Sequence, residues 1–196
     1  MTTSPSTPSG IRLGRRAAIV DIALAAALAG LLLVVTNGPG DVVPRPLALL
    51  ALYATPGIVG GVGVLGGRRG LVWAATIVLI PGSLLSMAGV TLVFILPAVL
   101  FAATAIAIGP GRAAGFDDLV DAILPAALVI AAGVALFRLT ANTCETDPSA
   151  AACSSAALTF AGVGLELALL AAAVSFAAWR AGLPRTIGAL RRGDAS

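Results

Sequence analysis

A single carboxylate in a long apolar segment is the residue best placed for chemistry in this chain. Glu166 lies near the middle of the apolar residues 156–179. Acidic residues at the centre of a membrane span cost about 2.5–3.5 kcal/mol on insertion scales, and they usually face the interior of a bundle. At helical spacing Glu166 shares a face with Thr159, Gly162 and Ala173, a set of small or weakly polar residues that suits helix contacts. We therefore predict that Glu166 faces other helices and is a candidate intramembrane ion or proton site.

Two further residues are candidate partners of this site, and a purely structural interpretation also stays open. Arg138 is nearest in type, although its side chain can extend toward the outer surface. Asp21 lies about one turn into the first apolar segment, where it can pair with Arg16 or Arg69, or act as a solvated charge near a helix N-terminus. Alternatively, Glu166 is a protonated acid that donates one hydrogen bond to a neighbouring carbonyl.

A second acidic group precedes the fifth apolar segment. Asp117, Asp118 and Asp121 could hold a divalent cation. They could equally be helix N-terminal charges favoured by the helix dipole, which is the interpretation we prefer. The chain has no histidine, which removes most zinc sites and many catalytic schemes. We find no P-loop, Rossmann, GxSxG or HExxH motif, and we expect no metal site, no cofactor and no enzymatic activity.

The composition indicates that membrane helices position these residues. Hydrophobic residues make up 59% of the chain, charged residues only 11%, and the mean hydropathy is +1.04. Residues 71–108 contain no charge. A helix needs about 20 apolar residues to cross a bilayer, so this segment predicts two spans joined as a hairpin. The basic pI reflects arginines beside spans and does not indicate nucleic-acid binding.

The expected fold is an all-α polytopic membrane protein. Its six transmembrane helices are predicted at residues 17–35, 47–65, 71–86, 90–108, 122–140 and 156–179. They form a bundle over residues 17–179, between a disordered tail at residues 1–16 and a basic tail at residues 180–196. A cleaved signal peptide competes for the first segment, because Ala27 and Ala29 resemble a cleavage site. We favour an uncleaved span, because the apolar run continues past that site and Asp21 would interrupt the signal.

The distribution of arginine predicts the orientation. Six spans place ten arginines on the side of both termini and only Arg45 and Arg138 on the other, so both termini are expected in the cytoplasm. Cys144 and Cys153 then lie in one outer loop, where an oxidising compartment favours a disulfide. A metal pair is the alternative, but two cysteines without histidine are a poor ligand set.

Glycine and proline suggest how the helices pack. Gly57 with Gly61, and Gly63 with Gly67, have the spacing that lets helix backbones approach closely, within the chain or between copies. Four spans contain a proline: Pro56, Pro81, Pro97 and Pro125. Proline can open a site in a broken transporter helix, but proline is also common in membrane helices, which is the interpretation we prefer.

Three functions fit this sequence, and we rank them. The first is a non-enzymatic accessory or scaffold protein that packs in the bilayer against a membrane partner or as a homo-oligomer. The second is a small proton- or cation-coupled transporter or channel that uses Glu166. The third, ranked last, is a lipid-active enzyme. Arginine as the only basic residue, with abundant alanine, glycine and proline, suggests a bacterial cell-membrane protein.

Overall fold

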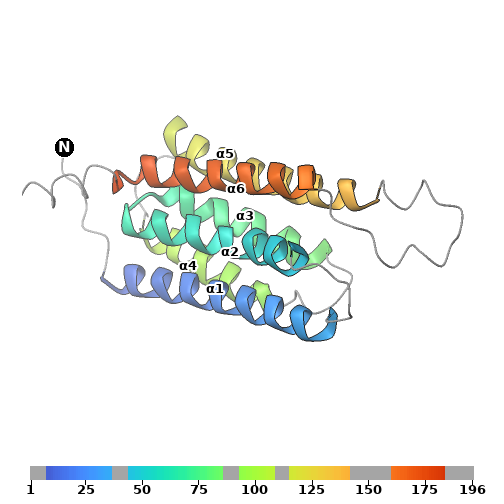
Figure 1. Ribbon diagram of the computed structural model, residues 1–196. Coiled ribbons are helices and arrows are strands. Elements are labelled where there is room, and N and C mark those ends of the chain that lie inside the picture. Colours follow the sequence, from blue (N-terminus) through green and yellow to red (C-terminus); the bar gives the residue numbers. More distant parts are fainter. Residues whose placement is uncertain (1–7, 37–43, 86–92, 109–114, 142–159, 184–196) are drawn as a thin grey trace, which may run out of the picture.

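The computed structural model describes residues 8–36, 44–85, 93–108, 115–141 and 160–183, and within them every regular element is a helix (Figure 1). The helices are α1 (Pro8–Thr36), α2 (Pro44–Leu65), α3 (Arg69–Leu85), α4 (Ile95–Ile108), α5 (Phe116–Ala141) and α6 (Phe160–Arg180). The all-helical prediction is therefore confirmed. Both cysteines lie outside the described residues, as do residues 184–196 of the expected basic tail.

The first helix starts earlier than the apolar pattern predicted. It begins at Pro8, whereas the sequence placed residues 1–16 in a disordered tail. Proline is favoured in the first turn of a helix, because its missing N–H has no helical acceptor there. Arg12, Arg15 and Arg16 are good helix formers and continue the same helix. These arginines therefore project from a helix at the end of the bundle.

Three helices are long and apolar enough to cross a membrane. The segments are Leu47–Leu65, Phe116–Leu136 and Gly162–Arg180. The α3 and α4 helices are also apolar but have only 17 and 14 residues. At 1.5 Å per residue, α4 extends about 21 Å, which is less than the hydrocarbon core of a bilayer. Within its described residues, the chain thus has three candidate membrane spans, which suggests a membrane protein.

The helices form three layers (Figure 1). The α1 and α4 helices lie on one side, α2 and α3 in the middle, and α5 and α6 on the other side. Successive helices run in alternating directions, so α1, α3 and α5 begin at the end where α2, α4 and α6 finish. This arrangement makes α2 a central element that packs against α1, α3, α5 and α6.

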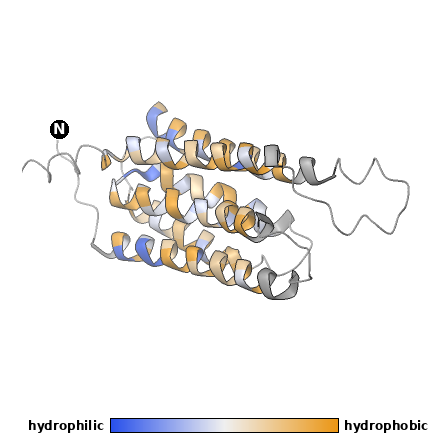
Figure 2. Ribbon diagram, in the orientation of Figure 1, coloured by the Kyte–Doolittle hydropathy of each residue, from blue (hydrophilic) through white to orange (hydrophobic). Residues whose placement is uncertain are grey.

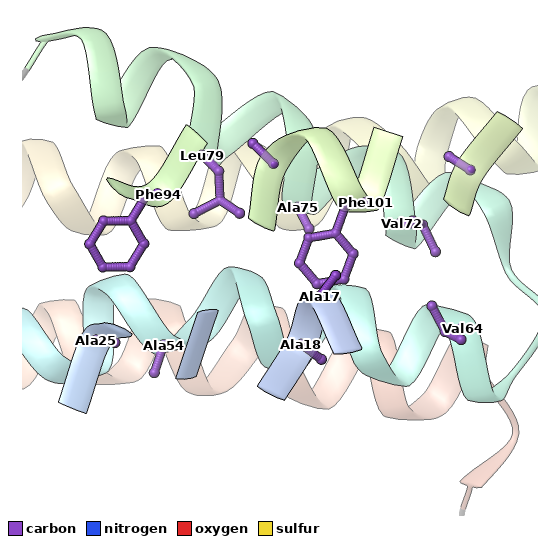
Figure 3. Close-up of a cluster of buried hydrophobic side chains, with 12 residues drawn as sticks. Ala17, Ala18, Ala25, Ala54, Val64, Val72, Ala75, Leu79, Phe94 and Phe101 are labelled. Carbon is purple, nitrogen blue, oxygen red and sulfur yellow. The ribbon is translucent and has the colours of Figure 1, made fainter. Parts of the chain in front are cut away.

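Glycines bring the backbone of α2 into close contact with its neighbours. A Cβ added at Gly60 would lie 2.6 Å from Cε1 of Phe101 and 2.9 Å from the Cβ of Ala75. A Cβ at Gly63 would lie 2.7 Å from the Cβ of Leu71. In Figure 3, Phe101 of α4 points toward the alanines of α1. An aromatic ring thus fills the space that a larger α2 residue would need.

Gly61 and Gly66 also lie against neighbouring helices. Gly61 faces Ala18 of α1, and a Cβ at Gly66 would lie 2.6 Å from the Cβ of Ala181 at the end of α6. Gly67 has a φ of 63°, a left-handed conformation that favours glycine after a helix C-terminus. The close approach that the sequence predicted therefore occurs within the chain.

The packing of Gly60 leads to a stability prediction. Gly60→Ala should lower the free energy of unfolding by about 1–3 kcal/mol, because the new methyl group overpacks against Phe101. Gly30→Ala in α1 is the matched control, since a Cβ there meets no atom within 4 Å. It should leave stability unchanged or raise it by up to about 1 kcal/mol. Unfolding of the purified variants in detergent measures both, and equal effects would contradict the packing.

Candidate functional site

Charged side chains gather at one end of the bundle, which we call the charged end. It carries Arg15 and Arg16 of α1, Arg68 before α3, Asp121 near the start of α5 and Arg180 at the end of α6. Figure 2 shows hydrophilic residues concentrated at this end, at the left of the view, and mostly apolar residues elsewhere. Among the described side chains, the charged end is therefore polar and the body of the bundle is apolar.

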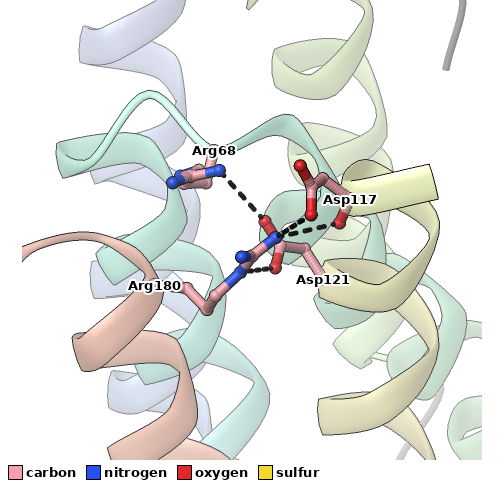
Figure 4. A network of polar contacts seen from close by, with 4 residues as sticks. All are labelled: Arg68, Asp117, Asp121 and Arg180. Atoms are coloured by element: carbon pink, nitrogen blue, oxygen red, sulfur yellow. Dashed lines mark hydrogen bonds and ion pairs between the residues drawn. The ribbon is translucent and has the colours of Figure 1, made fainter. Parts of the chain in front are cut away.

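An ion-pair network ties three segments together at the charged end (Figure 4). Arg180 donates from Nε to Oδ1 of Asp121 and from Nη2 to Oδ1 of Asp117 at 3.2 Å. Arg68 approaches Oδ2 of Asp121 from the other side, with an Nη1–Oδ2 distance of 3.7 Å. The side chain of Asp121 is fully buried, whereas that of Asp117 is 80% exposed. Asp121 is thus the buried centre of the network.

Backbone packing places these charges within reach of one another. Gly70 at the start of α3 lies directly against the Asp118 carbonyl and the Asp121 side chain at the start of α5. A helix N-terminus favours acidic side chains and a C-terminus favours basic ones. Asp117 in the first turn of α5 and Arg180 in the last turn of α6 follow this rule.

Two members of the predicted acidic group, Asp117 and Asp121, therefore bind arginine side chains. The interpretation of Asp117 and Asp121 as helix N-terminal charges was incomplete, because their arginine partners come from distant segments. In the described part of the chain, no three metal-ligating side chains lie together. Beside the network is a cavity of about 310 Å³, lined by Arg68, Arg180, Trp179 and the backbone around Gly66 and Gly182.

Glu166 lies inside the bundle, on the face that the helical spacing predicted. It has 0% exposure and shares the buried face of α6 with Leu170, Ala173 and Ala177. Leu170 and Ala173 pack against Val129 and Ala132 of α5, with Leu52 of α2 alongside. Neither carboxylate oxygen of Glu166 has a hydrogen-bond partner. A buried, unpartnered carboxylate is strongly unfavourable as an anion, so this residue must be neutral or bind a cation.

Asp21 is a second buried carboxylate without a partner. It has 0% exposure and lies against Gly57, whose missing side chain leaves room for Oδ2. The amide of Gly57 is close, but neither oxygen of Asp21 forms a hydrogen bond of normal geometry. The expectations of solvent exposure and of a pair with Arg16 or Arg69 are wrong, because the α1–α2 register turns Asp21 inward.

Arg138 is the other candidate partner of Glu166. Arg138 belongs to α5, but its side chain is not among the described residues. Asp21 is on α1 and Glu166 on α6, two helices that both pack against α2. Sequence reasoning missed Arg68 and Arg180 as partners of Asp121. A basic residue in the last turn of α6 and an acidic one in the first turns of α5 were the available signal.

Comparison with known proteins adds no function. No protein-family model matches the chain, and no curated protein or solved structure matches it either. The arrangement of the described side chains is therefore the basis for a functional proposal.

The network predicts different roles for its two aspartates. Asp121→Asn should lower the free energy of unfolding by about 2–3 kcal/mol, because it removes charge-assisted hydrogen bonding at a buried position. Asp117→Asn should cost less than about 1 kcal/mol, because exposed ion pairs contribute little. Denaturant unfolding in detergent compares the two variants. A larger effect at Asp117 would show that burial does not set the strength of the network.

Proposed function

We propose that the protein is a small membrane transporter or channel that binds and moves protons through its helix bundle at Glu166. The observation that carries this proposal is the full burial of a carboxylate that has no hydrogen-bond partner. A membrane protein that only needs to pack has no use for such a residue, since an apolar side chain of similar size would be more stable there. Intramembrane carboxylates of this kind often belong to ion and proton pathways.

The surroundings of Glu166 favour a proton over a metal cation. The described neighbours on its face and on α5 are apolar side chains such as Leu170, Val129 and Ala132. A metal cation of the hard class needs about six oxygen ligands. A proton needs only the carboxylate itself. Cation coupling is therefore the less favoured form of the same proposal.

The proposed topology has six crossings, with both termini in the cytoplasm of a bacterial cell. In this topology the charged end, with its arginines on α1, α3 and α6, would lie on the cytoplasmic side. Arg45 of α2 and Arg138 of α5 belong to the opposite end. An excess of arginine on the cytoplasmic side supports this orientation. The short α3 and α4 helices would form the inner hairpin.

This topology predicts where the cysteines react. Cys144 and Cys153 should form a disulfide on the outer side of the cell membrane. A membrane-impermeant maleimide applied to intact cells should label them only after reduction by an equally impermeant phosphine. Labelling without reduction would contradict the disulfide. Labelling that requires lysed cells would contradict the orientation.

The function itself is tested with Glu166→Gln in liposomes. We expect proton flux driven by a pH gradient to fall to the level of empty liposomes, because an amide does not exchange protons. Stability should be unchanged or higher, because the variant removes a buried ionisable group. Asp117→Asn, an exposed position at the charged end, is the matched control and should keep its flux. Absence of flux in the wild type as well would favour the second function.

The second candidate function is an accessory protein that packs against a membrane partner or a second copy. Gly164, Ala168 and Ala172 support it, because they are exposed on one face of α6 with small-residue spacing. A Cβ at Gly164 would meet no atom within 4 Å. Ala168→Leu should then disrupt association while leaving the fold intact.

A further inference from the structure

We propose that Asp21 and Gly57 form a second proton-binding site, separate from Glu166, at the contact between α1 and α2. Asp21 is buried to 0% exposure, and neither carboxylate oxygen forms a hydrogen bond of normal geometry, although the amide of Gly57 is close. The site gains a proton from water to form a neutral carboxylic acid and returns it to water when it ionises. No other reactant is needed.

Gly57 provides the space that this acid occupies. A Cβ added at Gly57 would collide with Oδ2 of Asp21 and lie 3.0 Å from its Cβ. Ala18 and Ala25 of α1 and Ala54 of α2 are buried in the same region. The carboxyl group of Asp21 therefore lies at a helix contact whose other buried side chains are small and apolar. A metal cation would find one carboxylate there and too few further oxygen ligands.

Among the described side chains, no charged one faces Asp21 from the helices packed against α1. These helices are α2 and α4. The described part of α4 contains no titratable residue. Among the described side chains of α2, Tyr53 is the titratable one, and its ring stacks on Phe94 at a centroid distance of 5.0 Å. On α1 itself, Arg15 and Arg16 are exposed and make no described ion pair with Asp21. A proton is thus the available means of neutralising this carboxylate.

A proline interrupts the backbone hydrogen bonding of α2 beside Asp21. Pro56 precedes Gly57 and has no N–H, so the carbonyl of Leu52 lacks its usual helical donor. Thr55 directs its hydroxyl to the carbonyl of Ala51 at 2.6 Å and does not replace that bond. The α2 helix is therefore weakened one residue from the Asp21 contact.

Infrared difference spectroscopy tests proton binding directly. Spectra of the purified wild type at acidic and alkaline pH should show the carbonyl stretch of a protonated acid that disappears as the pH rises. Asp21→Asn should lose the Asp21 component. Glu166→Gln should lose a different component and keep that of Asp21. This control separates a failure of the Asp21 site from a failure of the proposed transport function.

Two measurements keep the test decisive if Asp21→Asn folds poorly. Carbon-13 labelling of aspartate in the wild type should shift the Asp21 band and leave the Glu166 band in place. Sodium should not remove the Asp21 band at fixed acidic pH, with choline as the reference salt. The proposal is overturned if labelled aspartate shifts no protonated-acid band, if Asp21→Asn leaves the spectrum unchanged, or if sodium displaces the proton.

A double-mutant cycle tests whether Gly57 provides the space for the carboxyl group of Asp21. Gly57→Ala should lower the melting temperature strongly in the wild type, because the methyl group collides with the carboxyl group. In an Asp21→Ala background the same change should have a smaller effect, because the collision partner is gone. Gly30→Ala, which meets open space, should have the same small effect in both backgrounds. Equal losses for Gly57→Ala in both backgrounds would show that Gly57 does not accommodate Asp21.

Discussion

Close packing of the α2 backbone is the constraint on which the rest of the structure depends. Gly57, Gly60 and Gly63 let side chains from α1, α4 and α3 reach the helix surface. This contact draws α2 into the middle layer and fixes the register of its neighbours. Protein interiors at such density leave little room for water, so a polar side chain inside must find a partner or lose its charge.

The three carboxylates that are buried in the described part of the chain are neutralised in different ways. Asp121 is compensated by Arg180 and Arg68, and it joins the starts of α3 and α5 to the end of α6. Asp21 and Glu166 have no such partner. A buried carboxylate that only stabilised the fold would resemble Asp121, because an unpaired buried charge is costly. This contrast within one chain is the basis for assigning proton binding to the unpartnered pair.

The sequence predicted local features well and tertiary partners poorly. Apolar runs and glycine–proline breaks located the helices, and the small residues in step with Glu166 predicted that it faces inward. The partners of Asp121 could not be predicted, because Arg180 is 59 residues away and approaches only when α6 packs against α5. The burial of Asp21 could not be predicted, because it depends on Gly57 of another helix. Pro97 lies in the first turn of α4, where proline disturbs a helix little.

The contacts of α2 show how far along the bundle axis Asp21 and Glu166 lie, which we call their level. Gly66 lies beside Ala181, and Gly57 lies beside Asp21. With the rise of an α-helix, Asp21 is then roughly 13 Å and Glu166 roughly 22 Å from the level of Gly66. Between these levels α2 contains Pro56 and the carbonyl of Leu52 that Pro56 leaves without a donor. Since α2 packs against both α1 and α6, a displacement at Pro56 would reach both carboxylates. Coupling between the two proposed sites would therefore act through this turn of α2.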